Sequence, residues 1–166
     1  ADAGIREAFG VPLTFGTITV SDGISMGTQG MKYSLVSREV IADSVELSVR
    51  GHCYDALVGF AGCDKSLPGI MMAMLRLNVP SIFVYGGSIL PGRYHEKDVT
   101  VKDVFEIVGK YAAGACPLSE LEELERVACP GHGACGGQYT ANTMACVGEA
   151  IGLSLPNSNM APAPYS

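Results

Sequence analysis

The stretch "YDALVGFAGCDKSLPGIMMAMLRLNVPSIFVYGG", residues 54–87, contains two short apolar segments separated by a longer run of helix-forming residues. The outer segments, "YDALVGFAG" and "SIFVYGG", are short, apolar and bounded by turn residues, which predicts two buried strands. The segment between them, residues 68–78, begins with a proline, which suits the first turn of a helix, and continues with strong helix formers. The order strand, helix, strand predicts a parallel βαβ unit with a right-handed crossover.

Further strands and helices are predicted on both sides of this unit. Upstream, the alternating, β-branched residues 13–20 predict a first strand, and residues 34–49 have the spacing of an amphipathic helix. Downstream, "TVKD" at Thr100 resembles a capping box with Asp in place of Glu, and it predicts a helix to about Ala113. Two more helices are predicted at residues 118–128 and 139–153, and residues 86–98 read as a loop. We therefore expect an α/β fold whose parallel sheet is flanked by helices on both faces.

The length and the end of the chain bear on its domain organisation. A chain of 166 residues suits one domain with a sizeable core. Residues 1–155 are expected to form this α/β domain. Residues 156–166, "PNSNMAPAPYS", are rich in Pro, Asn and Ser and predict a linker-like tail that leads to a further domain.

Composition excludes several classes of protein. Hydrophobic residues make up 48% of the chain and charged residues 17%, and the mean hydropathy is +0.25, as in a mostly buried globular chain. A net charge of −6 and the lack of a Lys/Arg cluster argue against a nucleic-acid partner. No apolar run approaches the roughly 20 residues of a membrane span, and the start lacks the pattern of a secretory signal. We expect a cytoplasmic protein whose six cysteines are thiols or metal thiolates.

A cysteine, an aspartate and a lysine stand side by side at the end of the first strand of the βαβ unit. Thiolates such as Cys63 suit iron-sulfur iron or zinc, whereas Asp64 and Asp22 are hard oxygen donors that suit Mg²⁺. Lys65 would be repelled by a cation unless it were deprotonated, displaced or converted to an anion such as a carbamate. The alternative is a simple strand-to-helix turn, with Cys63 buried as a small hydrophobe, Asp64 capping the helix and Asp22 capping its own turn.

A second group of potential ligands lies in "ACPGHGACGGQ", before the last predicted helix. Cys129, His132 and Cys135 have a spacing that would suit zinc or an iron-sulfur cluster. The glycines around Cys135 leave room for a bulky cluster, so Cys135 is the better candidate, whereas His132 alone is more often a plain loop histidine. The three other cysteines are interpreted as structural: Cys53, Cys116 and Cys146.

The loop "SDGISMGTQG" after the first predicted strand is rich in glycine, but its pattern does not indicate nucleotide binding. Its spacing is not that of the G-x-G-x-x-G dinucleotide fingerprint, and no Walker lysine follows it.

Several longer motifs carry a resemblance to a known family. The segments "SDGISMGTQGMKYSLVSREVIADSVE", "GCDKSLPG", "RLNVPSIFVYGGSILPGR" and "CPGHGACGGQYTANTMACVGEAIGLSLP" span nearly the whole chain. In order and spacing they resemble the dihydroxy-acid dehydratases of branched-chain amino-acid synthesis, whose superfamily includes phosphogluconate dehydratase. The segments "YGGSILPGR" and "DVFEIVGKYAAG" favour the branched-chain group over the sugar-acid group.

The resemblance implies a set of cofactors and ligands. Cys63 and Cys135 match iron-sulfur ligands of a 2Fe-2S or 4Fe-4S cluster. Asp22 and Asp64 match Mg²⁺ ligands, and Lys65 matches a carbamylated lysine that binds the same ion. The implied reaction removes water from a small 2,3-dihydroxy carboxylic acid to give a 2-keto acid in valine and isoleucine biosynthesis, and the implied assembly is a homodimer.

The resemblance also implies parts that these residues do not supply. Family members are several times longer, a third cluster cysteine precedes Ala1, and a further carboxylate ligand and a serine base belong to a C-terminal β-rich domain. We therefore expect a fragment that is inactive alone. Two alternatives remain open: a sugar-acid dehydratase of the same superfamily, and a non-catalytic iron-sulfur or zinc module that uses Cys129, His132 and Cys135.

Overall fold

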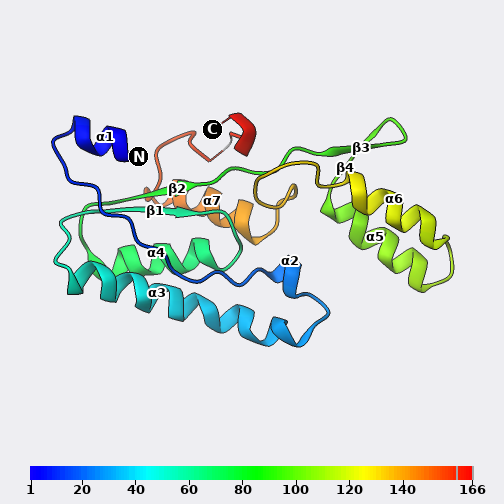
Figure 1. Ribbon diagram of the computed structural model, residues 1–166, viewed down its shortest axis with the longest axis horizontal. Helices are drawn as coiled ribbons and strands as arrows, with labels where there is room; N and C mark the ends of the chain where they lie inside the picture. Colours follow the sequence, from blue (N-terminus) through cyan, green and yellow to red (C-terminus); the bar gives the residue numbers. More distant parts are fainter. Residues whose placement is uncertain (160, 166) are drawn as a thin grey trace.

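The structure, a computed structural model, describes residues 1–159 and 161–165 and contains two units joined side by side (Figure 1). The larger unit holds a parallel pair of strands with helices packed against it, and the smaller unit holds an antiparallel hairpin and a pair of helices. The short helices α1 (Asp2–Glu7) and α2 (Asp22–Ser25) and the 3₁₀ turn η1 (Gln29–Tyr33) precede α3. None of the helices in the described part of the chain is long and apolar enough to cross a membrane.

The predicted βαβ unit is confirmed. Strand β1 (Leu57–Ala61) leads through a short turn to α4 (Ser66–Leu77), which returns the chain to β2 (Ser81–Tyr85). The two strands pair in parallel, from Leu57 opposite Ser81 to Ala61 opposite Tyr85. Helix α4 starts two residues before Pro68, so the proline lies within the first turn, where its missing N–H costs no helical hydrogen bond.

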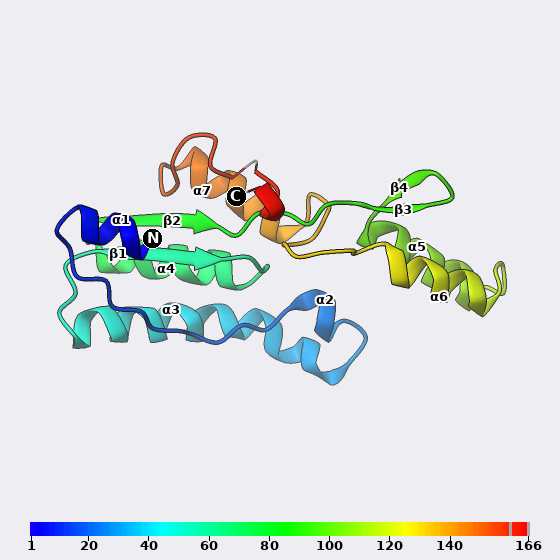
Figure 2. The same ribbon diagram turned by 45° about the horizontal axis from the view of Figure 1, so that its top comes forward.

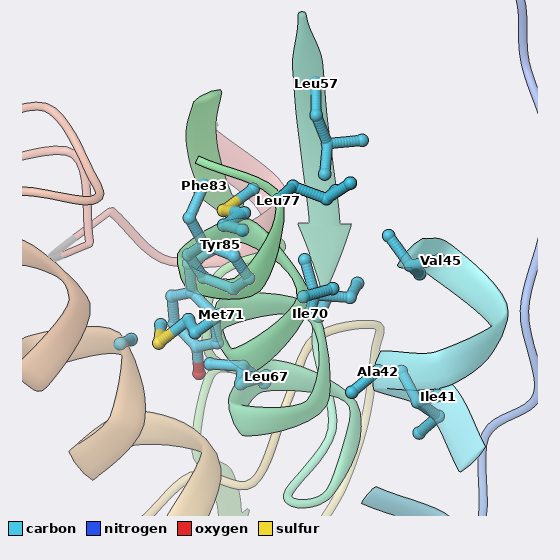
Figure 3. Close-up of a cluster of buried hydrophobic side chains, with 14 of the residues drawn as sticks. Ile41, Ala42, Val45, Leu57, Leu67, Ile70, Met71, Leu77, Phe83 and Tyr85 are labelled. Carbon is cyan, nitrogen blue, oxygen red and sulfur yellow. The ribbon is translucent and has the colours of Figure 1, made fainter. Parts of the chain in front are cut away.

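Helix α3 (Ser34–Gly51) and α4 pack closely against each other and form most of the core. The buried face of α3 carries Ile41, Ala42 and Val45 (Figure 3). Val49 is buried on the same helix, in agreement with the predicted amphipathic pattern. Gly69 of α4 permits the close approach, because a Cβ at this position would lie 2.8 Å from Cγ2 of Ile41. Helix α7 (Thr140–Ala150) packs against α4 and adds Ala141 and Ala145 to the same core.

The expectation of helices on both faces of the sheet is wrong for the described residues, although the mixed α/β class is confirmed. Helix α4 covers the face that carries Leu57, Ala61 and Phe83. On the opposite face Phe60 is 56% exposed and borders an open groove of about 1050 Å³ beside residues 9–19. Ile5 of α1 and the extended segment border this groove, so the face is only partly covered.

The predicted first strand at residues 13–20 is also wrong. These residues are extended but belong to no sheet, and the segment runs over α3 instead of beside β1 (Figure 2). Its contacts are made by side chains: the hydroxyls of Thr17 and Ser44 are hydrogen bonded, and the rings of Phe15 and Tyr54 lie 6.2 Å apart. Alternation of side chains was therefore a correct signal for extended backbone but not for strand pairing.

The smaller unit has a hairpin that the sequence did not predict. Strands β3 (Gly92–Tyr94) and β4 (Lys97–Val99) are antiparallel and are joined by His95 and Glu96, both with positive φ, at 44° and 63°. Positive φ at both positions is typical of a type I′ turn, which usually contains Asn or Gly. Because His95 and Glu96 are unusual in such a turn, the sequence predicted only a loop at residues 86–98.

Helices α5 (Val101–Ala112) and α6 (Leu118–Val127) complete this unit, as predicted. The capping box at the start of α5 is present. The Thr100 side chain accepts a hydrogen bond from the backbone N–H of Asp103, and the Asp103 side chain accepts one from the backbone N–H of Thr100. A separate hydrophobic core holds this unit together: Val99, Ile107, Leu121, Leu124 and Ala128.

Two segments that connect the units run side by side. The N–H of Ala134 donates to the carbonyl of Gly87 and the N–H of Ile89 donates to the carbonyl of Ala134, each at 2.8 Å. Gly133 has a φ of 130°, and a Cβ there would lie 2.4 Å from the nitrogen of Ile89. This joint brings the loop before α7 to the carboxyl end of β2.

The segment predicted as a linker-like tail packs back on the larger unit where it is described. The Asn159 side chain is buried and donates to the carbonyl of Ala145 at 2.8 Å. The N–H of Ala163, at the start of the turn η2 (Ala163–Tyr165), donates to the carbonyl of Ser88 at 2.9 Å. Residues 160 and 166, which this prediction also covered, lie outside the described residues.

Candidate functional site

The turn between β1 and α4 presents Cys63, Asp64 and Lys65 at the carboxyl end of the strand. The carbonyl of Cys63 fixes this turn, because it accepts hydrogen bonds from the Ser66 hydroxyl at 3.0 Å and from the N–H of Leu67 at 3.1 Å. Asp64 is 8% exposed, and its side chain does not cap α4. The structure therefore does not support the alternative prediction that Asp64 caps α4.

Asp22 and Asp64 meet around the amine of Lys65. The Lys65 Nζ lies 2.5 Å from Asp22 Oδ2 and 3.1 Å from Asp64 Oδ2. The backbone N–H of Asp22 donates to Asp64 Oδ1 at 3.2 Å, which holds the start of α2 against the β1–α4 turn. Side-chain exposures of 13% for Lys65, 23% for Asp22 and 11% for Asp64 place the cluster in a half-buried position.

The electrostatics of this cluster favour the charged forms. Burial opposes charge on Asp64, but hydrogen bonds from Cys63, Asp22 and Lys65 outweigh it and lower the pKa of this carboxyl. Burial likewise opposes charge on Lys65, yet the hydrogen bonds to Asp22 and Asp64 raise the pKa of its amine. The site is thus an ammonium group held between two carboxylates.

The thiol of Cys63 belongs to the same cluster. Its Sγ lies 3.0 Å from Asp64 Oδ1 and is the donor of this hydrogen bond. Burial and the contact with Asp64 raise the pKa of the Cys63 thiol above its ordinary value. A proton must therefore leave before this sulfur can bind a metal.

Cys135 lies on the loop before α7 and, like Cys129, is exposed. Burial is the largest cause that raises the pKa of the Cys135 thiol, and the charges of Asp64, Cys129 and Asp22 add to it. The side-chain amide of Asn142, in the first turn of α7, donates to the carbonyl of Cys135 at 2.9 Å and fixes this loop.

The remaining predicted ligands do not join the cluster. His132 and Cys129 are exposed, and within the described residues neither makes a hydrogen bond or ion pair with Asp22 or Lys65. The predicted structural role of the other cysteines fits Cys116, which is partly buried and packs against the smaller core. Cys53 and Cys146 are both exposed, so burial does not support this role for them.

Ser34 is a member of the site that sequence reasoning missed. It is the first residue of α3, is 1% exposed, and its hydroxyl donates a hydrogen bond to Asp22 Oδ1. A separation of twelve residues across a Gly-rich loop corresponds to no helical or strand period, so no pattern in the sequence pointed to this contact.

The donor set can be compared with the implied metals. Among residues 1–159 and 161–165 no group of three or more His, Cys, Asp or Glu side chains is placed to hold a metal ion. Asp22 and Asp64 supply hard oxygen donors, and the Lys65 amine occupies the position between their carboxylates. The set fits Mg²⁺ when the lysine is converted to an oxygen donor, and it does not fit the ion while the lysine is an ammonium.

In α/β proteins small ligands commonly bind beyond the carboxyl ends of parallel strands, and Cys63, Asp64 and Lys65 lie at such an end, with Asp22 against them. Residues 1–166 match the family described as "Dihydroxy-acid/6-phosphogluconate dehydratase N-terminal", so the chain belongs to this family.

Similar curated proteins carry the name dihydroxy-acid dehydratase. The proteins of Dinoroseobacter shibae and Pelagibacter ubique are each 72% identical over 162 residues, which is 98% of this chain and 28% of theirs. The protein of Chloroflexus aggregans is 61% identical over 159 residues, again 28% of its own length. The chain thus spans a little over a quarter of the length of the curated relatives it matches.

Proposed function

We propose that this chain is the N-terminal part of a dihydroxy-acid dehydratase, a hydro-lyase. Its substrates would be 2,3-dihydroxy-isovalerate and 2,3-dihydroxy-3-methylvalerate, which lose water to give the 2-keto acids of valine and isoleucine biosynthesis. The observation that carries the proposal is the meeting of Asp22 and Asp64 around Lys65, with the Cys63 thiol in contact with Asp64. The names of the relatives at about 70% identity support this substrate class over the sugar acids.

The proposed magnesium ligands are Asp22, Asp64 and Lys65 in its carbamylated form. To form the carbamate, the Lys65 ammonium first loses a proton, and the neutral amine then forms a C–N bond to CO₂ and releases a second proton. The product is a carboxylate-like anion in place of a cation. In the structure, the Nζ of the unmodified Lys65 lies 2.5 Å and 3.1 Å from the two carboxylates. Conversion to the carbamate would therefore leave three anionic oxygen donors around one position.

Cys63 and Cys135 are the proposed ligands of an iron-sulfur cluster, either 2Fe-2S or 4Fe-4S. The Cys63 thiol contacts Asp64, and Cys135 lies on a different loop, before α7. When bound, the cluster and the Mg²⁺ ion would act as Lewis acids on the leaving hydroxyl group and on the opposite end of the same substrate. Cys63 and Asp64, as neighbours in sequence, would hold these two groups at a fixed separation.

These residues position and polarise the substrate but include no assigned base. Lys65 is engaged by both carboxylates, and Asp64 accepts hydrogen bonds from Cys63 and from the backbone of Asp22. The proton abstraction at C2 is therefore assigned to a serine in a C-terminal β-rich domain, as the resemblance implies. A homodimer in the cytoplasm completes the proposal.

The test is the production of 2-keto acid by the polypeptide that carries this chain, purified without oxygen and supplied with Mg²⁺ and bicarbonate. Asp64→Asn should lower kcat/KM for 2,3-dihydroxy-isovalerate by more than about 100-fold, because loss of an outer-shell group alone typically costs 10–100-fold. The matched control is Asp55→Asn, which makes the same change at an exposed aspartate before β1 and should leave kcat/KM unchanged.

Two results would overturn the proposal in different ways. Turnover of aldonic acids but not of branched-chain dihydroxy acids would assign the chain to the sugar-acid dehydratases that its family also includes. Zinc without acid-labile sulfide, lost on replacement of Cys129 and His132, would assign it to the non-catalytic metal modules.

A further inference from the structure

Asp22 lies on a short and weakly supported element. Helix α2 has four residues, its N-cap makes no side-chain hydrogen bond, and the preceding residues 13–20 belong to no sheet. The Asp22 carbonyl accepts a hydrogen bond from the N–H of Met26 within this helix, and the hydrogen bond from the Asp22 N–H to Asp64 ties the helix to the β1–α4 turn. Something else must fix the direction of its carboxylate.

Helix α3 provides this second support through Ser34. The Ser34 hydroxyl donates to Asp22 Oδ1, while the other oxygen of the same carboxylate, Oδ2, faces the Lys65 amine at 2.5 Å. The carboxylate is thus bound at one oxygen by α3 and directed with the other toward the space shared with Asp64. Free rotation of the Asp22 side chain would break both contacts.

The backbone of Ser34 is engaged elsewhere, which leaves the hydroxyl for Asp22. Its N–H donates to the carbonyl of Met31, and its carbonyl accepts a 2.6 Å hydrogen bond from the hydroxyl of Ser37. At 1% exposure the hydroxyl has no access to bulk water. A buried hydroxyl whose hydrogen bond goes to a charged acceptor is both strongly held and costly to remove.

We propose that Ser34 is a positioning residue for the magnesium site, which orients Asp22 so that one carboxylate oxygen remains a ligand. The proposal rests on the proposed function, because it takes Asp22 and Asp64 to be the Mg²⁺ ligands. Groups that orient a metal ligand in this way typically change metal affinity by 10–100-fold. Through Ser34, the packing of α3 on α4 also sets the distance between Asp22 and the β1–α4 turn.

The test is the affinity of the whole polypeptide for Mn²⁺, used as a paramagnetic substitute for Mg²⁺ and followed by electron paramagnetic resonance. Ser34→Ala should weaken Mn²⁺ binding about 10–100-fold. The matched control is Ser37→Ala, which removes a hydroxyl from the same helix turn at 3% exposure but makes no contact with Asp22. It should lower the Tm by a similar amount and leave the Mn²⁺ affinity unchanged.

A double-mutant comparison separates positioning from general destabilisation. In an Asp22→Ala background, Ser34→Ala should cause no further loss of Mn²⁺ affinity, because the ligand through which it acts is gone. If Ser34→Ala does not fold, Ser34→Cys keeps the volume of the side chain with a weaker donor, and it should lower the affinity in the same direction.

The outcomes also separate this inference from the proposed function. Dehydratase turnover by the wild type, with equal Mn²⁺ affinities for wild type, Ser34→Ala and Ser34→Cys, would overturn the role of Ser34 alone. Additive losses in the Asp22→Ala background would also overturn it. A wild type that forms no 2-keto acid would overturn the proposed function, whatever the affinities of the serine variants.

Discussion

At the scale of single residues, the predictable part of the site is the part that is contiguous in sequence. Cys63, Asp64 and Lys65 follow a strand, so their place at its carboxyl end could be deduced from the order of elements. Asp22 was grouped with Asp64 as a hard oxygen donor that follows a predicted strand, and it reaches Asp64 although that strand is not formed. Ser34 could not be predicted, because its contact depends on the path of residues 23–33, which no period describes.

Lys65 gives the clearest residue-scale prediction. Lys65→Arg keeps a positive charge between the two carboxylates but supplies a guanidinium that does not react with CO₂. The variant should fold, because the ion pairs are kept, and it should bind Mn²⁺ at least about 100-fold more weakly than the wild type. The measurement is a Mn²⁺ titration, with intact mass in bicarbonate to detect one added CO₂ on the wild type only. Wild-type affinity in the arginine variant would contradict the carbamate.

At the scale of elements, local signals succeeded where they report local structure. The helices at residues 34–49, 68–78, 100–113 and 118–128 were predicted from periodicity, capping and composition, and they are present within a few residues. Strand pairing depends on a partner that the pattern does not contain, so residues 13–20 were assigned to a sheet that has no third strand. The hairpin was missed for the opposite reason, because His95 and Glu96 are unusual in its turn.

The unpaired segment can be tested by hydrogen exchange. Residues 11–20 make no backbone-to-backbone hydrogen bond among the described residues, whereas β1 and β2 share a regular parallel ladder. The amides of residues 13–20 should therefore exchange at least about 100-fold faster than those of β1, because opening of a packed strand costs several kcal/mol. Mass spectrometry of short peptides would measure the difference. Equal protection of both segments would mean that residues 13–20 form a third strand in solution.

At the scale of the whole molecule, the two units are stabilised by separate cores. The larger core draws on α3, α4, α7 and both parallel strands, whereas the smaller one is built from β4, α5, α6 and the residue after α6, with no shared member. The sequence predicted the helices of both units, but it gave no sign that they would divide into two cores, because residues 86–98 and 129–138 read only as loops. The site residues all lie in or next to the larger unit.

The separation of the two cores predicts that the same substitution will have different consequences in each unit. Leu124→Ala and Leu77→Ala both remove a buried leucine, at 4% and 6% exposure, and each should cost about 2–5 kcal/mol of local stability. For Leu124→Ala, amide exchange should rise in α5 and α6 while amide exchange in α3 and α4 and the Mn²⁺ affinity stay as in the wild type, because the smaller core can open alone.

For Leu77→Ala, amide exchange should rise in α3 and α4, and Mn²⁺ affinity should fall, since α3 carries Ser34 and α4 follows Lys65. A uniform rise in exchange across both units for either variant would show that the two cores unfold as one cooperative structure.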